Sequence, residues 1–288
     1  FQNAILIDKK TVKAGDLVHV IIKVQLKDGW KNYWEFSGGI SEAMHFNWHT
    51  PKGLKLINMQ FPYPKYTFDK YIGAAYVNHG DVLYVATFKV DDDAQGTLDL
   101  SATINWQTCE ANGGCIQPNQ PPVIKVPIVI GEESIANEEG KDAYRTALKH
   151  LPKAAPAGWK ISAEKITLNI VDGKKKSKDA YKVTITAPHK LSKYKTHFFP
   201  AMPHVGYEER YYGYEKIRDN IISKTFELNN AAHPDSIKPY SKLIGVVTFE
   251  KDGKTIAYNL TGEIKGVATD AVKPPMFKES AAPQIKQV

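Results

Sequence analysis

Short apolar segments separated by turn residues are the feature that most restricts the fold of this chain. In segment 18–24, apolar side chains recur at alternate positions, which is typical of a strand with one buried face. Segments of similar composition lie at 5–7, 17–26, 44–48, 82–90, 98–106 and 123–130. Turn residues such as Lys27-Asp28-Gly29 and Pro51-Lys52-Gly53 separate them. Strands spaced in this way, without intervening helices, predict an antiparallel β-sandwich.

The strand pattern stops after residue 131 and then resumes. Helix-forming residues extend from Glu132 to Leu151, where Tyr144, Leu148 and Leu151 share one helical face, and Pro152 ends the helix. Further strand-like segments lie at 159–170, 180–187, 221–228, 243–249 and 255–264. We therefore predict an all-β chain of two sandwiches. Its expected parts are a first domain over 1–131, a helical linker over 132–157, a second domain over 158–266 and a flexible tail over 267–288.

Size and charge narrow the range of functions. The chain has 288 residues, enough for two domains that each bury a core. Its formal net charge is +7, but the densest basic run, Lys174-Lys175-Lys176, follows Asp172-Gly173 and is typical of a charged hairpin tip. Basic residues are not interleaved with stacking aromatics, so we predict no nucleic-acid partner. No apolar run is long enough to span a bilayer, and the start at Phe1 fits a mature chain whose targeting segment is not displayed.

Two cysteines, Cys109 and Cys115, are the strongest chemical signal in the sequence. Strand-like residues run into the first and leave from the second, and Asn112-Gly113-Gly114 lies between them. Glycine and asparagine favour a tight reversal of the backbone. A hairpin of this length can bring the two sulfurs face to face across neighbouring strands, so the spacing is compatible with a disulfide.

Such a disulfide could be a structural staple or a redox centre. Closing a loop of about seven residues restrains the unfolded chain by only roughly 2–2.5 kcal/mol, whereas a staple between two sheets would close a much longer loop. A short disulfide in a turn that already forms locally is therefore a poor staple, and exposed loop disulfides are the ones that reduce readily. Loop size favours a redox-active pair, and the staple remains the alternative.

Other roles for these residues fit less well. Met44, His45 and His49 could suggest a copper-handling protein, but two histidines four apart on a strand are about 13 Å apart, too far to chelate one ion. A cysteine nucleophile of the protease type would be quenched by a second cysteine six residues away. We therefore predict no metal site and no cofactor. A non-enzymatic binding module of two sandwiches with an incidental disulfide stays open.

The cysteine hairpin and the segments before it resemble a known family. Trp106 precedes the C-x5-C pair and Ile116-Gln117-Pro118 follows it, as in the amino-terminal periplasmic domain of the thiol:disulfide interchange protein DsbD and the related suppressor-of-copper-sensitivity reductases. Upstream, 28–34 resembles the family's Asp-Gly-aromatic segment, 49–54 its Pro-x-Gly turn, and 60–64 its aromatic–proline segment. The agreement in order covers residues 15–130 and weakens after 157.

This resemblance implies an immunoglobulin-like fold and a redox role in the periplasm. It implies that Cys109 and Cys115 carry electrons from a membrane-embedded donor domain to periplasmic thioredoxin-like proteins, with Cys109 bonded to the partner and Cys115 resolving. The donor could lie in the same chain beyond residue 288 and tether it to the inner membrane.

The resemblance also implies a short cap loop over the sulfurs, here residues 65–75. Its acidic and aromatic positions best match Asp69 and Tyr71, with Phe68 as the alternative shielding ring. Lys70 departs from the family's acidic pattern, which puts a proton-handling role of the cap in doubt. Tyr33, at the end of the Asp-Gly-aromatic segment, is expected near the active site. The second domain, without a cysteine, is expected to space, dock or dimerise.

Overall fold

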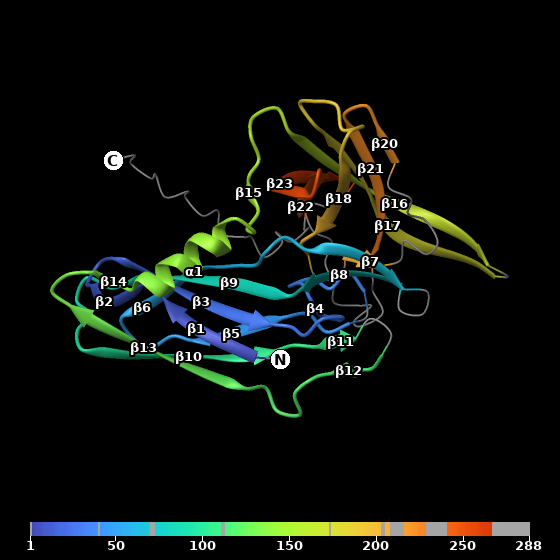
Figure 1. The fold of residues 1–288 in the computed structure, drawn as a ribbon. Helices are drawn as coiled ribbons and strands as arrows, with labels where there is room; N and C mark the ends of the chain where they lie inside the picture. The colour runs from blue at the N-terminus through green and yellow to red at the C-terminus, as the bar shows by residue number, and fades with distance from the viewer. Residues whose placement is uncertain are drawn as a thin grey trace.

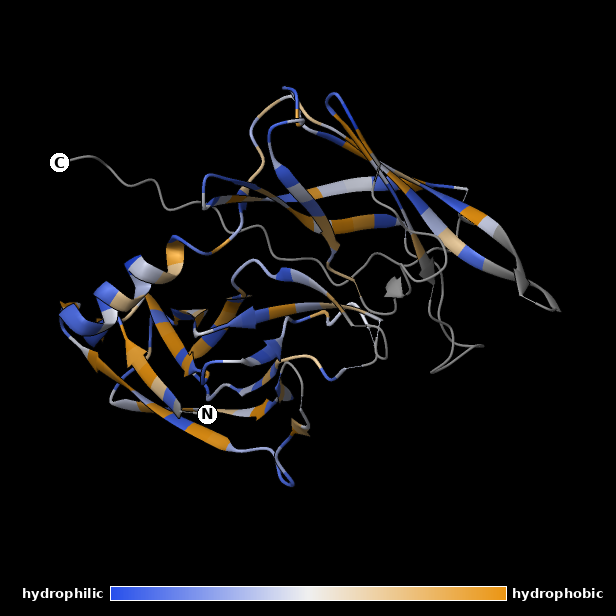
Figure 2. Ribbon diagram, turned by 45° about the vertical axis from the view of Figure 1, so that its right-hand side comes forward, coloured by the Kyte–Doolittle hydropathy of each residue, from blue (hydrophilic) through white to orange (hydrophobic). Residues whose placement is uncertain are grey.

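The computed structural model describes residues 2–39, 41–69, 73–110, 113–172, 174–202, 205–207, 216–228 and 241–266. Nearly all the described elements are strands, and most of their pairings are antiparallel (Figure 1). Short parallel contacts join β2 to β13, β15 to β23 and β16 to β23. Hydrophobic residues concentrate in the strands, whereas the turns that join them are mostly hydrophilic (Figure 2). The prediction of an all-β chain with antiparallel sandwiches is confirmed.

The first sandwich has two main sheets. One contains β1 (Gln2–Ile7), β3 (Leu17–Gln25), β9 (Asp81–Val90) and β6 (Leu54–Gln60), in that order. The other contains β14 (Ile135–Ala136), β2 (Lys9–Lys13), β13 (Val123–Gly131), β10 (Thr97–Asn105) and β5 (His45–His49). Aromatic side chains join the two across the core: the rings of Trp48 and Phe88 lie 5.0 Å apart, and those of Phe46 and Tyr84 lie 5.1 Å apart.

Helix α1 (Glu138–Leu148) covers the outer face of the first of these sheets. Ala147 and Leu151 pack there against Ile21, Leu83 and Val85. This cover explains why Ile21 is apolar between Val20 and Ile22, since both faces of β3 are buried. The helix lies so close to β1 that a Cβ on Gly140 would meet the Ile7 carbonyl oxygen, so this position needs a glycine. The helix is shorter than the predicted 132–151, and it is packed on the first sandwich.

A third, smaller sheet extends from one end of the first sandwich and carries the cysteines. Its order is β12 (Cys115–Ile116), β11 (Thr108–Glu110), β4 (Trp30–Tyr33), β8 (Gly73–His79) and β7 (Lys65–Asp69). Each neighbouring pair is antiparallel. Segments that are far apart in the sequence therefore meet beside the cysteine hairpin. We call this sheet the cysteine sheet.

The second sandwich follows one hydrogen-bonded path of strands. The order is β18 (Lys195–Pro200), β22 (Lys242–Lys251), β23 (Lys254–Lys265), β16 (Lys160–Asp172), β17 (Lys174–Thr186), β21 (Ile221–Leu228) and β19 (Val205–Tyr207). Two short strands pair beside it, β15 (Lys153–Ala154) with β23 and β20 (Lys216–Arg218) with β21. The rings of Phe198 and Phe226, from strands near opposite ends of the path, lie 5.9 Å apart, so the path folds back around a core. The predicted hairpin of β16 and β17 is confirmed, with Asp172 opposite Lys174.

The second sandwich packs against the cysteine sheet through aromatic rings. Phe199 contacts Tyr76 with ring centroids 5.0 Å apart and Trp34 at 6.3 Å. His197 stacks on Tyr66 at 5.1 Å, and the Lys224 ammonium lies 5.5 Å from the centre of the Tyr66 ring. Since Tyr66 and Tyr76 are opposed on β7 and β8, these contacts support the back of that hairpin.

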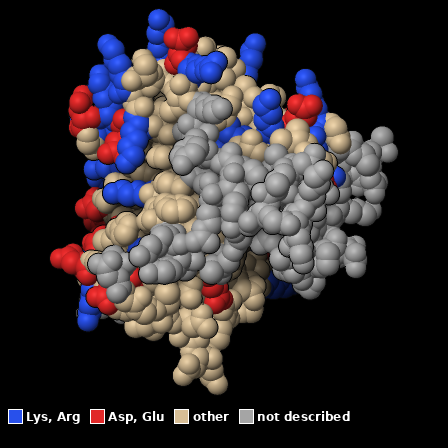
Figure 3. Space-filling model, turned by 90° about the vertical axis from the view of Figure 1, so that its right-hand side faces the viewer, with Lys and Arg blue, Asp and Glu red and all other residues tan. Residues whose placement is uncertain are grey.

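The surface shown in Figure 3 carries charges of both signs. On the face in Figure 3, Lys and Arg side chains lie among Asp and Glu side chains, in keeping with a diffuse charge excess. Within the described part of the chain, no helix has the length and apolar character needed to cross a bilayer.

Candidate disulfide-exchange site

Cys109 and Cys115 form a disulfide that crosses from β11 to β12. The sulfurs are 2.04 Å apart, and the Cα atoms of the two directly opposed residues are 4.1 Å apart. Main-chain hydrogen bonds close the turn between the strands, including one of 3.1 Å from the Glu110 N–H to the Gly114 carbonyl oxygen. The predicted hairpin disulfide is therefore present.

The two cysteines differ sharply in exposure. Cys109 lies between β4 and β12 and is 3% exposed. Cys115 lies on β12, the edge strand of the cysteine sheet, and is exposed together with Ile116. Within the described part of the chain, Cys115 is therefore the cysteine open to solvent, whereas the sheet covers Cys109.

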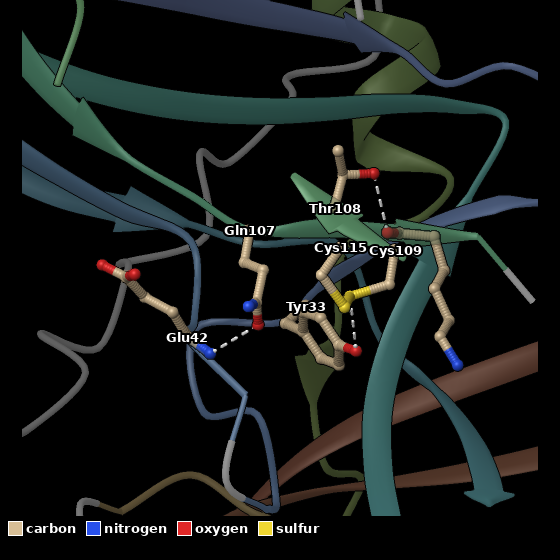
Figure 4. Close-up of a disulfide and its surroundings, with 7 residues drawn as sticks. Tyr33, Glu42, Gln107, Thr108, Cys109 and Cys115 are labelled. Carbon is tan, nitrogen blue, oxygen red and sulfur yellow. Dashed lines mark hydrogen bonds between the residues drawn. A yellow bond between two sulfur atoms is a disulfide. The ribbon is translucent and has the colours of Figure 1, made fainter. Parts of the chain in front are cut away.

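Tyr33 contacts the buried sulfur directly. Its hydroxyl donates a hydrogen bond to Cys109 Sγ, with 3.2 Å between oxygen and sulfur (Figure 4). Tyr33 is itself fully buried and packs with Cys109, Ala75 and Val77 in a small apolar cluster. The structure thus places Tyr33 against the Cys109 sulfur, and its part in an active site stays a prediction.

Side-chain hydrogen bonds fix the strand that carries Cys109. The Thr108 hydroxyl donates to the Lys31 carbonyl oxygen at 2.9 Å, which ties β11 to β4 beyond the regular ladder. The Gln107 side-chain oxygen accepts a hydrogen bond from the Glu42 N–H at 3.0 Å (Figure 4). Both residues next to Cys109 on its amino-terminal side are thus held, so the buried sulfur has a defined position.

The comparisons with known proteins agree with this geometry. Residues 2–126 match the family model described as thiol:disulfide interchange protein DsbD, N-terminal. The matched region contains both cysteines, Tyr33 and all five strands of the cysteine sheet. Residues 2–126 are therefore similar in sequence to the amino-terminal domain of DsbD.

Solved structures extend the likeness in fold beyond residues 2–126. The N-terminal periplasmic domain of ScsB from Proteus mirabilis matches 91% of this chain over 92% of its own length, with 16% identity and a TM-score of 0.59. The DsbD N-terminal domain of Neisseria meningitidis, in the reduced form, covers 46% of the chain at 15% identity and a TM-score of 0.25. No curated protein matches the sequence. The ScsB match therefore establishes that its fold spans both sandwiches here.

The described residues of the predicted cap are strand. Residues 65–69 and 73–75 belong to β7 and β8, which extend the cysteine sheet sideways. Phe68, opposite Ala74, lies on the face away from Ala75 and is 49% exposed. Its ring is therefore on the other side of the hairpin from the Cys109 cluster. Asp69 ends β7 with its side chain outside the described residues, as is all of Tyr71, so their shielding role stays a prediction.

Two charged groups near the disulfide were not anticipated. Lys31 is directly opposite Cys109 on β4, and its side chain is largely buried, with 8% exposure. His79 is opposite Lys31 on β8, and burial together with the positive charges of Lys65 and Lys31 lowers the pKa of its ring despite a hydrogen bond to the Trp30 carbonyl. The signal for Lys31 was available, since it lies two residues before Tyr33 and so shares its strand face.

Two acidic residues, Glu110 and Glu35, lie within two positions of Cys109 and Tyr33 in the sequence. Glu110 is opposite Trp30, so its side chain points to the other face of the sheet. Glu35 follows Tyr33 by two residues, and its Oε1 atom is buried without a hydrogen-bond partner in the described structure. Burial raises the pKa of the Glu35 carboxyl to about 8.

The residues considered for copper are not gathered around one point. His45 and His49 are both exposed on β5, four residues apart, whereas Met44 is buried in the core. Within the described residues, no group of three or more His, Cys, Asp or Glu side chains could hold a metal ion.

Proposed function

We propose that this protein is a periplasmic thiol:disulfide exchange module that passes electrons through the Cys109–Cys115 pair to thioredoxin-like proteins. The observation that carries the proposal is the division of the disulfide, with Cys115 exposed on an edge strand and Cys109 buried against Tyr33. An exchange protein needs one sulfur that a partner can reach and a second held close enough to resolve the mixed disulfide. The similarity of residues 2–126 to the amino-terminal domain of DsbD supports this chemistry.

The proposed reduction of a partner takes two steps. The Cys115 thiolate attacks one sulfur of the partner disulfide, a mixed disulfide forms, and the other partner sulfur leaves as a thiolate. The Cys109 thiolate then attacks the Cys115 sulfur, which restores the Cys109–Cys115 disulfide and releases the second partner thiolate. Two electrons move to the partner. This assignment reverses the expectation from resemblance that Cys109 bonds to the partner, because Cys109 is covered by the sheet.

Reduction of the disulfide follows the same path in reverse. A thiolate of the electron donor, which we place in a membrane-embedded domain, attacks the exposed Cys115 sulfur. The disulfide breaks and the electron pair remains on Cys109, which leaves as a thiolate. The hydrogen bond from the Tyr33 hydroxyl would stabilise that leaving sulfur, since hydrogen bonds to a charged form favour it. A second donor thiolate then releases Cys115.

The second sandwich has a supporting part in this proposal. It contains no cysteine, so it does not exchange disulfides. Its Phe199 and His197 contact the β7–β8 hairpin, whose β8 strand contributes Ala75 and Val77 to the Cys109 cluster. We propose that it holds this hairpin in place while partners dock at β12.

The test is disulfide exchange with a defined partner. Reduced protein is mixed with an oxidised thioredoxin-like domain, the reaction is stopped by alkylation, and products are identified by mass spectrometry. We expect oxidation of the pair in the native protein and a trapped mixed disulfide through Cys115 in Cys109→Ala. The Cys115→Ala variant is the matched control, in which the remaining buried thiol should trap little partner. If the native thiols persist beside an oxidised partner, the proposal fails.

The reduction potential separates this function from a structural staple. Staples in exported proteins are typically below about −300 mV, whereas exchange proteins lie above that value. Equilibration of the pair with glutathione or dithiothreitol buffers would measure it. A value in the staple range would favour the rival interpretation, a binding module of two sandwiches.

A further inference from the structure

Lys31 is a buried basic residue beside the disulfide. It has no part in the exchange steps proposed above. It is 8% exposed, and among the described residues it forms no ion pair. A lysine is rarely buried to this degree, because removing an ammonium from water is costly. Its position therefore calls for a functional explanation.

The strand register places the Lys31 side chain on the same face as the Cys109 sulfur. Lys31 and Cys109 are directly opposed in the antiparallel β4–β11 ladder, and opposed residues have Cβ atoms about 5 Å apart on one face. Tyr33, two residues further along β4, reaches Cys109 Sγ with its hydroxyl, which confirms that this face of β4 carries the sulfur. Lys31 and Tyr33 thus lie on the face of β4 that carries the buried sulfur.

The other charged groups around Cys109 leave Lys31 as its nearest fixed charge in the ladder. On β8, His79 is opposite Lys31 and therefore one strand further from the sulfur, and Lys65 on β7 is opposite Val77. On β11 itself, Glu110 points to the opposite face. Glu42, from the loop before β5, is exposed, and its contact near the site is through its backbone N–H to Gln107. Among the side chains that the structure describes on the disulfide's face of β4, β8 and β7, the ionisable ones are the basic residues Lys31, His79 and Lys65; Asp69 ends β7 on the same face, with its side chain outside the described part.

We infer that the Lys31 ammonium stabilises Cys109 as a thiolate and so acts as a positioning residue for disulfide exchange at Cys115. The inference rests on the proposed function and specifies which sulfur carries negative charge when the bond opens. As a donor thiolate attacks Cys115, the disulfide breaks and its electron pair moves onto Cys109. The positive charge of Lys31 then balances the negative charge that develops on the buried sulfur.

The physical need for this charge follows from burial. A thiolate formed in an apolar cluster has lost water, so burial alone would raise the pKa of the Cys109 thiol. A cation within about 4–6 Å lowers the pKa of an acidic group by roughly 1–3 units. A leaving thiol of lower pKa also departs faster. Lys31 would thus favour attack of a thiolate on the Cys115 sulfur, with Cys109 as the thiolate that leaves.

The test measures the pKa of Cys109 without any partner. In a Cys115→Ala background, the ultraviolet absorbance of the thiolate is followed against pH in the full-length protein. We expect Lys31→Met to raise the Cys109 pKa by about one unit or more. Lys31→Arg, which retains the charge, should stay close to the parent. Lys125→Met, at an exposed lysine on β13, is the matched control and should leave the pKa unchanged.

A second measurement guards against a variant that does not fold. If Lys31→Met does not fold, Lys31→Gln takes its place. The rate at which dithiothreitol reduces the intact disulfide is then measured in wild type and Lys31→Arg, which carry the charge, and in the uncharged variant. Slower reduction in the uncharged variants, with recovery in Lys31→Arg, supports the inference. An unchanged Cys109 pKa in a folded, uncharged variant overturns it. Failure of the wild-type protein to exchange with a thioredoxin-like partner would instead overturn the proposed function, because the pKa measurement uses no partner.

Discussion

The cysteine hairpin has an inner half, β11 with Cys109, and an outer half, β12 with Cys115. Each half carries one cysteine, but the inner one is buried and the outer one is exposed. On the inner half, Cys109 is bordered by β4 and contacts Tyr33, Ala75 and Val77. On the outer half, Cys115 lies on a two-residue edge strand that pairs with β11 alone among the described strands. One sulfur is thus part of a packed cluster, and the other is presented to solvent.

This contrast shows how a sandwich can carry redox chemistry with few specialised residues. The inner half is supported in layers: Cys109 rests on β4 and β8, and β8 rests through Tyr76 on Phe199 of the second sandwich. The outer half is held by its turn and by the disulfide itself. Rigidity on one side and access on the other are what sequential disulfide exchange requires.

The largest expected effect is the difference in reactivity between the two thiols. In the reduced, folded protein, we expect an alkylating reagent to modify Cys115 about 100-fold faster than Cys109, because reactivity requires both thiolate character and access. Peptide mass spectrometry after timed quenching measures both rates. In denaturant the two rates should converge, which is the control. Equal rates in the folded protein would contradict the proposed roles.

Removing the support behind the inner half should be the next largest effect. Phe199 is 1% exposed and contacts Tyr76 and Trp34, so Phe199→Ala should lower the free energy of unfolding by about 3–5 kcal/mol. Hydrogen exchange of the β7 and β8 amides should accelerate with it.

Ile256→Ala, at an apolar residue of the second sandwich that is 48% exposed, is the control for Phe199→Ala and should cost about 1 kcal/mol or less. If Phe199→Ala accelerates exchange in the second sandwich alone, the two sandwiches are not coupled at this hairpin.

The buried carboxyl of Glu35 should make stability depend on pH. The folded-state pKa of about 8 is above the ordinary value of 4.5, so the folded protein holds the proton more tightly than the unfolded chain. Stability is then full below pH 4.5 and falls as pH rises toward 8. Glu35→Gln should remove this fall and be more stable than wild type at high pH, by roughly 1–3 kcal/mol.

Urea midpoints on either side of this interval measure the effect. Glu164→Gln, at an exposed glutamate of β16, serves as the control and should follow the wild-type pH profile. If the urea midpoints of Glu35→Gln and wild type change with pH in the same way, water reaches the charged Glu35 carboxylate and the prediction is wrong.

The smallest effect is expected from the hydrogen bond to the buried sulfur. Tyr33→Phe keeps the ring in its cluster and removes the hydroxyl that donates to Cys109 Sγ. We expect reduction of the disulfide to slow about two- to five-fold, corresponding to a net hydrogen bond of about 0.5–1 kcal/mol. The rate with dithiothreitol measures it, and Tyr258→Phe in the second sandwich should leave the rate unchanged. Faster reduction in Tyr33→Phe would show that the hydroxyl stabilises the disulfide instead.

Much of the site could be predicted because its signals are local. The glycine-containing turn between Cys109 and Cys115 predicts a hairpin, and opposed cysteines in a hairpin predict the disulfide. Tyr33 was placed near the site by resemblance. The cap was predicted as a loop over the sulfurs, but its described residues belong to β7 and β8, because the edge of β4 offers hydrogen bonds that a loop would leave unmade. Lys31 was passed over because its importance depends on which residue of β11 is opposite.

The sequence by itself determined the strands, the cysteine hairpin and the division into two sandwiches, since alternation and turn residues act over a few positions. Only the tertiary structure decided which cysteine is exposed, that Lys31 and Tyr33 lie on the face of β4 that carries the Cys109 sulfur, and that Phe199 supports the sheet behind them. These features join segments far apart in the chain. Their placement depends on strand order, register and burial, which no local pattern encodes.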